Sequence, residues 1–248
     1  IPRGNGHGGA RSLHVGGTAM VMAGEALLAK ARLLAAHLLQ AAPEAFTYLE
    51  GRFALPDGRG MDLAALAAAA ADPANLPDAM PPGLAAEAWN GSEARTFPMG
   101  VHVAEVEVDP DTGLVEIPRY IVVDDVGHAI NPMIVRGQVH GGVAQGVGQA
   151  VHERTAYDRE SGQLLSASFM DYALPRAEDL PDIEVDLIEV PCETNPMGVK
   201  GAGEAGAVGS PPAVVNALVD ALAGDGVRHL DMPATPEVIW KALHARAA

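Results

Sequence analysis

Residues 131–153 read NPMIVRGQVHGGVAQGVGQAVHE, and this stretch predicts a glycine-rich helix. Asn131 is a typical N-cap and Pro132 a typical first helical residue, so we expect the helix to begin there and to run to about Val151. Inside a helix, each glycine costs roughly 1 kcal/mol relative to alanine. The helix nevertheless holds five glycines, which therefore need a physical reason: Gly137, Gly141, Gly142, Gly146 and Gly148.

Two interpretations of these glycines are open at the level of the sequence. Glycine allows close approach, and Gln138, Gln145 and Gln149 supply amide donors and acceptors along the same helix. The first interpretation is a helix pressed against a polar ligand, with its N-terminus available to anionic groups. The second is tight packing of the helix on a sheet, with the glutamines facing solvent.

The segment before this helix has the pattern of a β-hairpin. Residues 101–108 alternate apolar and polar side chains, residues 109–113 (DPDTG) are turn formers, and residues 114–124 resume the strand pattern. After the helix, residues 157–165 predict a turn between strands and residues 183–190 alternate as a further strand.

Two more helices are expected near the C-terminus. Ser210 followed by Pro211 has the residue types of a helix start, and this helix would end near Gly224. A last helix would begin at Thr235, with Pro236 as its first residue. Because strands and helices are interspersed without the regular spacing of βαβ units, the predicted fold class is α+β, with mixed sheets and packed helices.

The N-terminal part is predicted to begin with a glycine-rich loop over residues 1–17. Apolar residues at helical spacing then predict a buried helix over residues 18–42, ended by Pro43. Residues 46–56 predict a short strand and turn. Residues 61–91 are rich in alanine and proline, which indicates a helical turn followed by a surface excursion.

Composition excludes several classes of function. The chain has 248 residues, 16 Lys and Arg against 32 Asp and Glu, and a formal net charge of −16, which argues against a nucleic-acid binder. Its single cysteine, Cys192, excludes an internal disulfide, and also an iron–sulfur cluster or a cysteine-based zinc site held by this chain alone. The chain starts at Ile1 rather than at Met, from which we expect a processed chain or the later part of a longer one.

A second glycine-rich stretch, residues 198–212, reads GVKGAGEAGAVGSPP. Residues 201–206 match the letters of the dinucleotide fingerprint G-x-G-x-x-G, but the preceding strand ends near Val190 and the next helix is expected only at Ser210. We therefore reject a nicotinamide dinucleotide site. What remains is one carboxylate, Glu204, in a loop almost without side chains. It is either a desolvated general base, whose pKa burial would raise, or an ordinary surface glutamate.

Taken together, these segments resemble the molybdenum-binding subunit of the xanthine dehydrogenase, aldehyde oxidase and carbon monoxide dehydrogenase family of molybdenum hydroxylases. The resemblance covers most of the chain, is weakest over residues 55–95, and places the chain in the C-terminal part of a longer family subunit. Four stretches carry it, in the family's order: GGARSLHVGG, FPMGVHVAEVEVDPDTG, VDDVGHAINPMIVRGQVHGGVAQGVGQAVHE and GVKGAGEAGAVGSPPAVVNAL.

The resemblance implies a molybdenum held through a pterin, not by protein side chains, with oxo, sulfido and hydroxide ligands. In bacterial members the cofactor is usually molybdopterin cytosine dinucleotide, whose pyrophosphate suits bare backbone N–H groups. Glu204 matches the family's catalytic glutamate, the general base for that hydroxide, and Gln138 matches the glutamine near the molybdenum and the pterin. The other matches to cofactor-lining residues are Gly9, Ala10, Arg11, Ser12, Lys200, Gly201, Ala202 and Gly203.

The implied function is oxidative hydroxylation, with water as the oxygen source, of an aldehyde, an N-heterocycle or a substrate of the carbon monoxide type. The implied partners are the N-terminal part of the molybdenum subunit, an iron–sulfur subunit with 2Fe-2S clusters and an FAD subunit, with no nucleic acid and no membrane span. The alternative is a non-catalytic lobe for cofactor binding or assembly. The expected location is cytoplasmic, with the periplasm open through a partner's signal.

On this reading the whole chain, residues 1–248, is the C-terminal part of one molybdopterin-binding domain. Five segments are expected within it: a glycine-rich cofactor loop (1–17), a helix and variable excursion (18–95), a hairpin and glycine-rich helix (96–152), strands and the catalytic glutamate loop (153–210), and C-terminal helices (210–248).

Overall fold

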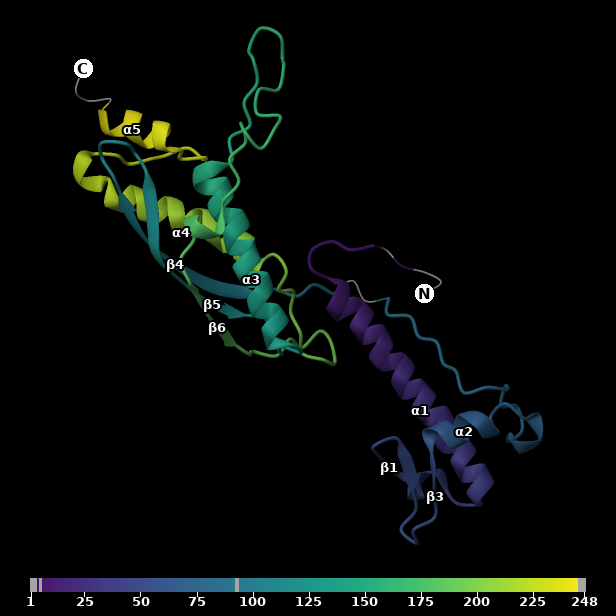
Figure 1. The fold of residues 1–248 in the computed structure, drawn as a ribbon. Helices are drawn as coiled ribbons and strands as arrows, with labels where there is room; N and C mark the ends of the chain where they lie inside the picture. Colours follow the sequence, from purple (N-terminus) through teal and green to yellow (C-terminus); the bar gives the residue numbers. More distant parts are fainter. Residues whose placement is uncertain (1–3, 5, 92–93, 245–248) are drawn as a thin grey trace. The chain divides into compact units, whose positions relative to one another are not determined.

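The structure, a computed structural model, describes residues 4, 6–91 and 94–244 (Figure 1). The predicted α+β fold class is confirmed, because helices and two three-stranded sheets are interspersed along the chain. The chain divides into two compact units, one formed by Val15–Glu93 and the other by the segments up to His14 and from Ala94 onward. Parts of three predicted segments lie outside the described residues. They are residues 1–3 and 5 of the cofactor loop, residues 92–93 of the excursion and residues 245–248 of the C-terminal helices.

The larger unit is built on a sheet with the strand order β4-β5-β6. β4 (Met99–Val108) and β5 (Val115–Asp125) form the predicted antiparallel hairpin. Its turn is held by Asp109, whose carboxylate accepts hydrogen bonds from the Asp111 amide and the Thr112 hydroxyl. β6 (Ile183–Ile188) runs parallel to β5, with Tyr120 opposite Ile183.

Three α-helices belong to this unit: α3 (Pro132–Val147), α4 (Ala205–Ala221) and α5 (Pro236–His244). α4 packs on β4 and α3 packs on α4 (Figure 1). The core between the sheet and the helices is made largely of aliphatic side chains, which include Val122, Val139, Val143, Val214 and Leu218.

The glycine-rich helix begins as predicted. Asn131 caps α3 by accepting a hydrogen bond from the Ile134 amide at 3.2 Å, and Pro132 is the first helical residue. A π-helical turn, Gly148–His152, continues α3 to the predicted end. The prediction of the last helix is also confirmed, since α5 begins at Pro236.

The start predicted for α4 is wrong. The helix begins at Ala205, with Glu204 as its N-cap, so Ser210 and Pro211 lie inside it. A proline inside a helix costs about 3 kcal/mol because it removes a backbone hydrogen bond, which is why the sequence favoured a helix start there. Ser210 and Pro211 are buried, and the packing of this turn against α3 outweighs the local preference.

The predicted turn over residues 157–165 forms without flanking strands. Tyr157 and Leu164 make a single isolated bridge, and the Asp158 carboxylate accepts hydrogen bonds from the Ser161 amide and hydroxyl. The strand pattern expected on either side is absent from the described part of this segment.

The smaller unit packs α1 (Thr18–Leu39) and α2 (Leu63–Ala69) against a sheet of three short antiparallel strands. The strands are β1 (Thr47–Leu49), β2 (Arg52–Ala54) and β3 (Gly60–Asp62). Leu34, Phe53 and Leu66 lie fully buried in its core.

Two predicted boundaries of α1 differ in the structure. A π-helical turn, Ser12–Gly17, precedes α1, so the predicted loop over residues 1–17 ends earlier than expected. At the other end the helix stops at Leu39, because Gln40 adopts the left-handed conformation with φ of 49°. Pro43 instead starts a short 3₁₀ turn, Pro43–Ala45.

In the described ranges 4, 6–91 and 94–244, no helix is both long and apolar enough to cross a membrane.

Candidate functional site

The candidate site centres on the loop that carries Glu204 into the start of α4. Glu204 is the N-cap of this helix, and its side chain makes no capping hydrogen bond. Of the two surroundings that the sequence left open for Glu204, the structure shows the exposed one and not a desolvated carboxylate. The physical reason is local: the neighbouring Ala202 and Gly203 have no side chains long enough to cover it.

The entry to this loop is fastened to the end of β5. Gly127 and Val199 form an antiparallel bridge, the Lys200 amide donates to the Val126 carbonyl at 2.8 Å, and the His128 amide donates to the Gly198 carbonyl at 2.9 Å. Gly127 has a positive φ of 65°, and a Cβ at this position would lie 2.3 Å from the Gly198 carbonyl oxygen. Only glycine therefore allows the two segments to approach so closely.

The Lys200 side chain forms an ion pair with Asp125, in which the Nζ and Oδ2 atoms are 2.5 Å apart. Both side chains are nearly buried, with 10% and 9% of their surface exposed. Burial acts to raise the pKa of Asp125, but hydrogen bonds from Lys200, Gly127 and Val190 outweigh it and hold the pKa below its usual value. The ammonium group of Lys200 is therefore engaged inside the protein.

Gln138 lies beside the glutamate loop. An added Cβ at Gly203 would be 3.6 Å from the Nε2 atom of Gln138, so the α3 side chain and the loop are in contact range. Gln138 is exposed on α3. The structure thus brings together Gln138 and the residue next to Glu204, which are far apart in the sequence.

The N-terminal glycine-rich loop reaches the same place. A Cβ at Gly201 would lie 2.7 Å from the Cβ of Ala10, so these two backbones pack closely. Gly9 and Ala10 both have positive φ, 57° and 51°, which gives a tight turn. Arg11 and Ser12 follow, both exposed, and the Ser12 hydroxyl lies 2.6 Å from Nδ1 of His7.

The glycines of α3 serve two different purposes. A Cβ at Gly142 would lie 2.8 Å from the Ala207 amide nitrogen, and one at Gly146 would lie 1.8 Å from the Ser210 hydroxyl. These two glycines therefore allow close packing, although the partner is the helix α4 and not the sheet. Gly137 and Gly141 instead face open space within the described chain, on the side where Gln138 is exposed.

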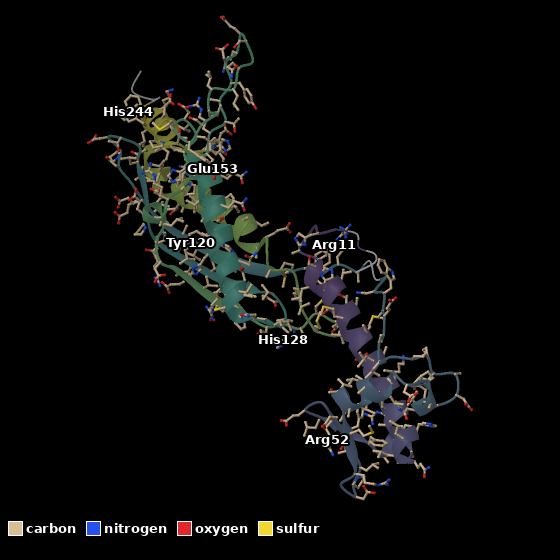
Figure 2. All side chains as sticks on the ribbon, turned by 45° about the vertical axis from the view of Figure 1, so that its right-hand side comes forward. Arg11, Arg52, Tyr120, His128, Glu153 and His244 are labelled. Atoms are coloured by element: carbon tan, nitrogen blue, oxygen red, sulfur yellow. The ribbon has the colours of Figure 1, made fainter. Side chains whose placement is uncertain are left out.

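A polar groove of about 410 Å³ lies along the second half of the same helix. Gln145, Gln149, Glu153 and Tyr172 line it, and the Tyr172 hydroxyl donates to Glu153 at 2.6 Å. Glu153 lies at the C-terminal end of the helix (Figure 2). The sequence pointed to the glutamines but not to Glu153 or Tyr172, because only the fold brings residue 172 to this helix.

Sequence reasoning also missed a buried polar group under α4. His102 on β4 lies 3.0 Å from the hydroxyl of Tyr120 and 3.5 Å from Asp124, both on β5 (Figure 2 labels Tyr120). Burial, and then the charge of Asp124, raise the pKa of Tyr120. A Cβ at Gly209 would lie 2.5 Å from the His102 ring, so α4 rests directly on it. The sequence did hold one signal for this group. His102 and Asp124 each stand at a position of their strand where the alternation places buried, mostly apolar side chains.

Among residues 4, 6–91 and 94–244, no group of three or more His, Cys, Asp or Glu side chains is placed to hold a metal ion.

Comparison with known proteins identifies the family to which this chain belongs. The family description "molybdopterin cofactor-binding domain" matches residues 1–181. The chain belongs to this family of cofactor-binding domains. Glu204 lies beyond the matched range, although it is inside the region shared with the relatives described next.

The relatives are components of molybdenum-dependent oxidoreductases. The carbon monoxide dehydrogenase large chain of Hydrogenophaga pseudoflava is 37% identical over 98% of this chain. The gamma subunit of the 6-hydroxypseudooxynicotine dehydrogenase complex of Paenarthrobacter nicotinovorans is 38% identical over 97%. The crystal structure of quinoline 2-oxidoreductase from Pseudomonas putida 86 has a TM-score of 0.87 at 35% identity over 98%.

These comparisons confirm the resemblance to the large subunits of molybdenum hydroxylases. This chain spans about 30% of the length of the two curated relatives and 31% of the quinoline 2-oxidoreductase chain.

The residues present fit a pterin cofactor. Two loops with almost no side chains, around Ala10 and Gly201, lie against each other, and a Cβ at Gly201 would intrude on Ala10. The amide of Gln138 stands next to Gly203 and provides both a donor and an acceptor. Gly203 is exposed beside this amide, so the loop presents backbone and amide groups that suit a polar cofactor with a phosphate-bearing tail.

Proposed function

We propose that this chain is the C-terminal lobe of the molybdenum subunit of a molybdenum hydroxylase, in which Glu204 is the general base. The reaction is the oxidative hydroxylation of an aldehyde, an N-heterocycle or a substrate of the carbon monoxide type, with oxygen from water. The observation that carries the proposal is the place of Glu204. Its carboxylate is not used for capping, and it stands next to Gly203, which the Gln138 amide approaches.

Residues of both loops would hold the cofactor, which we propose to be molybdopterin cytosine dinucleotide. The first loop would contribute Gly9, Ala10, Arg11 and Ser12. The second would contribute the backbone of residues 200–203, which packs against Ala10, and the Gln138 side chain reaches from α3 toward Gly203. The Lys200 and Gly201 amides already donate to Val126 and Thr96, so in this loop residues 202 and 203 would offer N–H groups to a pyrophosphate. When bound, the cofactor supplies the two-electron oxidation and the centre at which water-derived oxygen reaches the substrate.

Glu204 holds and moves a proton in this scheme. Its carboxylate accepts the proton of the attacking oxygen and thereby makes that oxygen the stronger nucleophile. A general base of this kind contributes roughly 10²- to 10⁴-fold to a rate. Gln138 orients the cofactor beside it through its amide, and the glycine-rich loop leaves room for both.

The rest of the enzyme is proposed to come from other segments and chains. The outer face of β4 leaves Met99, Val101 and Val103 exposed, while the alternate residue His102 faces α4. This apolar face supports the packing of the N-terminal part of the molybdenum subunit. Because a single cysteine leaves no electron path within this chain, we also propose an iron–sulfur subunit and an FAD subunit as partners.

The test is Glu204→Gln in the native protein that contains this chain. We expect turnover to fall by roughly 10²- to 10⁴-fold, while the molybdenum content stays that of the wild type, because the amide keeps the shape but cannot take a proton. Glu193→Gln is the matched control, since Glu193 is an exposed glutamate in the segment just before this loop. If Glu204→Gln turns over at the wild-type rate, Glu204 is not the general base, and the alternative of a non-catalytic lobe for cofactor binding or assembly is favoured.

A further inference from the structure

Asp125 joins three separate segments of the larger unit. Its Oδ1 atom accepts hydrogen bonds from the Gly127 amide at 2.9 Å and the Val190 amide at 3.2 Å. Its Oδ2 atom accepts the third, from the Lys200 ammonium at 2.5 Å. One carboxylate at the end of β5 therefore binds the turn that follows it, the segment after β6 and the entry of the Glu204 loop.

This ion pair is much more buried than the Arg119–Glu184 pair of the same sheet. Asp125 and Lys200 are nearly buried, whereas Arg119 and Glu184, which pair across β5 and β6 at 2.8 Å, are about half exposed. Two charges are taken out of water only where each is well paired, and removal of one partner leaves the other uncompensated. The Asp125–Lys200 pair is thus a strong local constraint, while the Arg119–Glu184 pair is a weak one.

The ion pair lies just before the part of the glutamate loop that has almost no side chains, residues 201–203. Before Lys200 the chain is held by the Asn195 side chain, which bonds both the amide and the carbonyl of Val199. After Lys200 comes one hydrogen bond from the Gly201 amide to the Thr96 hydroxyl at 3.2 Å. The Ala202 carbonyl then accepts a hydrogen bond from the Ala205 amide at 3.4 Å. The loop is therefore held at its entry by the Lys200 ion pair together with the backbone bonds to the end of β5, and at its exit by α4.

We propose that Asp125 and Lys200 are positioning residues for Glu204. Their ion pair fixes the entry of the loop and thereby the place of the Glu204 carboxylate relative to Gln138. This inference rests on the proposed function of Glu204. It gives Lys200 a role that acts through Asp125, in addition to the place of its backbone in the cofactor-lining loop.

The experiment compares Lys200→Met with Arg119→Met in the native protein that contains this chain. Lys200→Met removes the buried donor and keeps much of the side-chain volume. Arg119→Met removes an ion pair from the same strand, far from the loop in sequence. For each variant we would measure hydrogen exchange of the amides of residues 199–203, molybdenum content, kcat and KM.

For Lys200→Met we expect exchange of the loop amides to accelerate by about tenfold, with exchange in α3 and β4 unchanged. We also expect kcat to fall by roughly 10- to 100-fold, with KM and molybdenum content near those of the wild type, because a misplaced base lowers the rate without weakening binding. Arg119→Met should change none of these quantities. Asp125→Asn keeps an oxygen for the two amides but opposes Lys200 with an N–H group, and it should accelerate loop exchange in the same way.

Unchanged exchange of the loop amides in Lys200→Met would overturn the inference, and so would an equal acceleration across α3 and β4, which would mean general destabilisation. A fall in kcat of the same size in Arg119→Met would overturn it as well. The exchange measurement does not depend on the chemistry of Glu204. If Glu204→Gln keeps full turnover, the proposed function fails, while the loop exchange still decides whether the ion pair anchors the loop.

Discussion

At the N-terminus of α4, Glu204 occupies the cap position, but its carboxylate makes no capping hydrogen bond. Asp, Asn, Ser and Thr are the usual caps because their short side chains reach the first free amides of the helix. Glutamate is longer, and in Glu204 the carboxylate stays available because it makes no capping hydrogen bond. The residue choice therefore suits a proton acceptor held at a fixed helix end.

At the same scale, Asp125 predicts a pH dependence of stability. Its pKa lies below the ordinary value of 3.8 in the folded protein, so the folded state favours the charged form. The stabilisation is fully present above the unfolded pKa, and it is lost as the pH falls below 3.8 toward the lower folded pKa.

The measurement is urea unfolding of the wild type and of Asp125→Asn as a function of pH. We expect the wild type to be the more stable protein near neutral pH, and the difference in free energy of unfolding to shrink as the pH falls below 3.8. A difference that stays constant down to the most acidic pH studied would contradict this assignment.

At the scale of elements, the crossing of α3 and α4 determines where the site forms. Gly142 and Gly146 let the turn of α4 that holds Ser210 sit against α3. This contact aligns the N-terminus of α4, with Glu204, beside Gln138 on α3. The same helix therefore uses part of its glycines for packing and keeps the others on its open face.

Two alanine substitutions in α3 separate these roles. For Gly146→Ala we expect a loss of roughly 1–3 kcal/mol in the free energy of unfolding, because the new Cβ would meet the Ser210 hydroxyl at 1.8 Å and Pro211 at 2.8 Å. For Gly141→Ala we expect a gain of about 0.5–1 kcal/mol, since the new Cβ would meet no described atom within 4 Å beyond the adjacent residues and the backbone of its own helix, and alanine is the better helix former. Denaturant unfolding of both variants is the measurement. Equal effects of the two substitutions would show that the helix crossing is not tightly packed.

At the scale of the whole molecule, two units with separate cores share one chain, and the candidate site lies in the larger of them. The site is open on the side of Glu204 and Gln138, both of which are exposed. A lobe of this kind, which spans about 30% of its curated relatives, fits an enzyme whose active site is completed by further protein.

The prediction at this scale concerns cofactor content. Native protein that contains this chain should hold about one molybdenum per copy and release a cytidine nucleotide on denaturation, because the two bare loops suit a pterin with a pyrophosphate-linked nucleotide. Elemental analysis with chromatography of the released nucleotide is the measurement. Native protein with its partners fully loaded but without molybdenum would contradict it.

Local signals in the sequence were sufficient for several elements. Three features depend on residues that are close to each other in the chain, so capping, turn and alternation patterns determine them. They are the start of α3 at Asn131 and Pro132, the hairpin of β4 and β5, and the start of α5. The α+β class and the family followed from the same patterns and from the quoted motifs.

The tertiary structure decided what local signals could not. Ser210 and Pro211 have the residue types of a helix start, yet they lie within α4 because burial against α3 is worth more than the local preference. The Asp125–Lys200 pair and the meeting of Gly201 with Ala10 join residues distant in sequence, and no spacing rule predicts such contacts. The sequence by itself thus determined the elements and the family motifs, because those rest on short-range physics. Only packing decided that the loops around Ala10 and Gly201 meet, because these residues are far apart in the sequence.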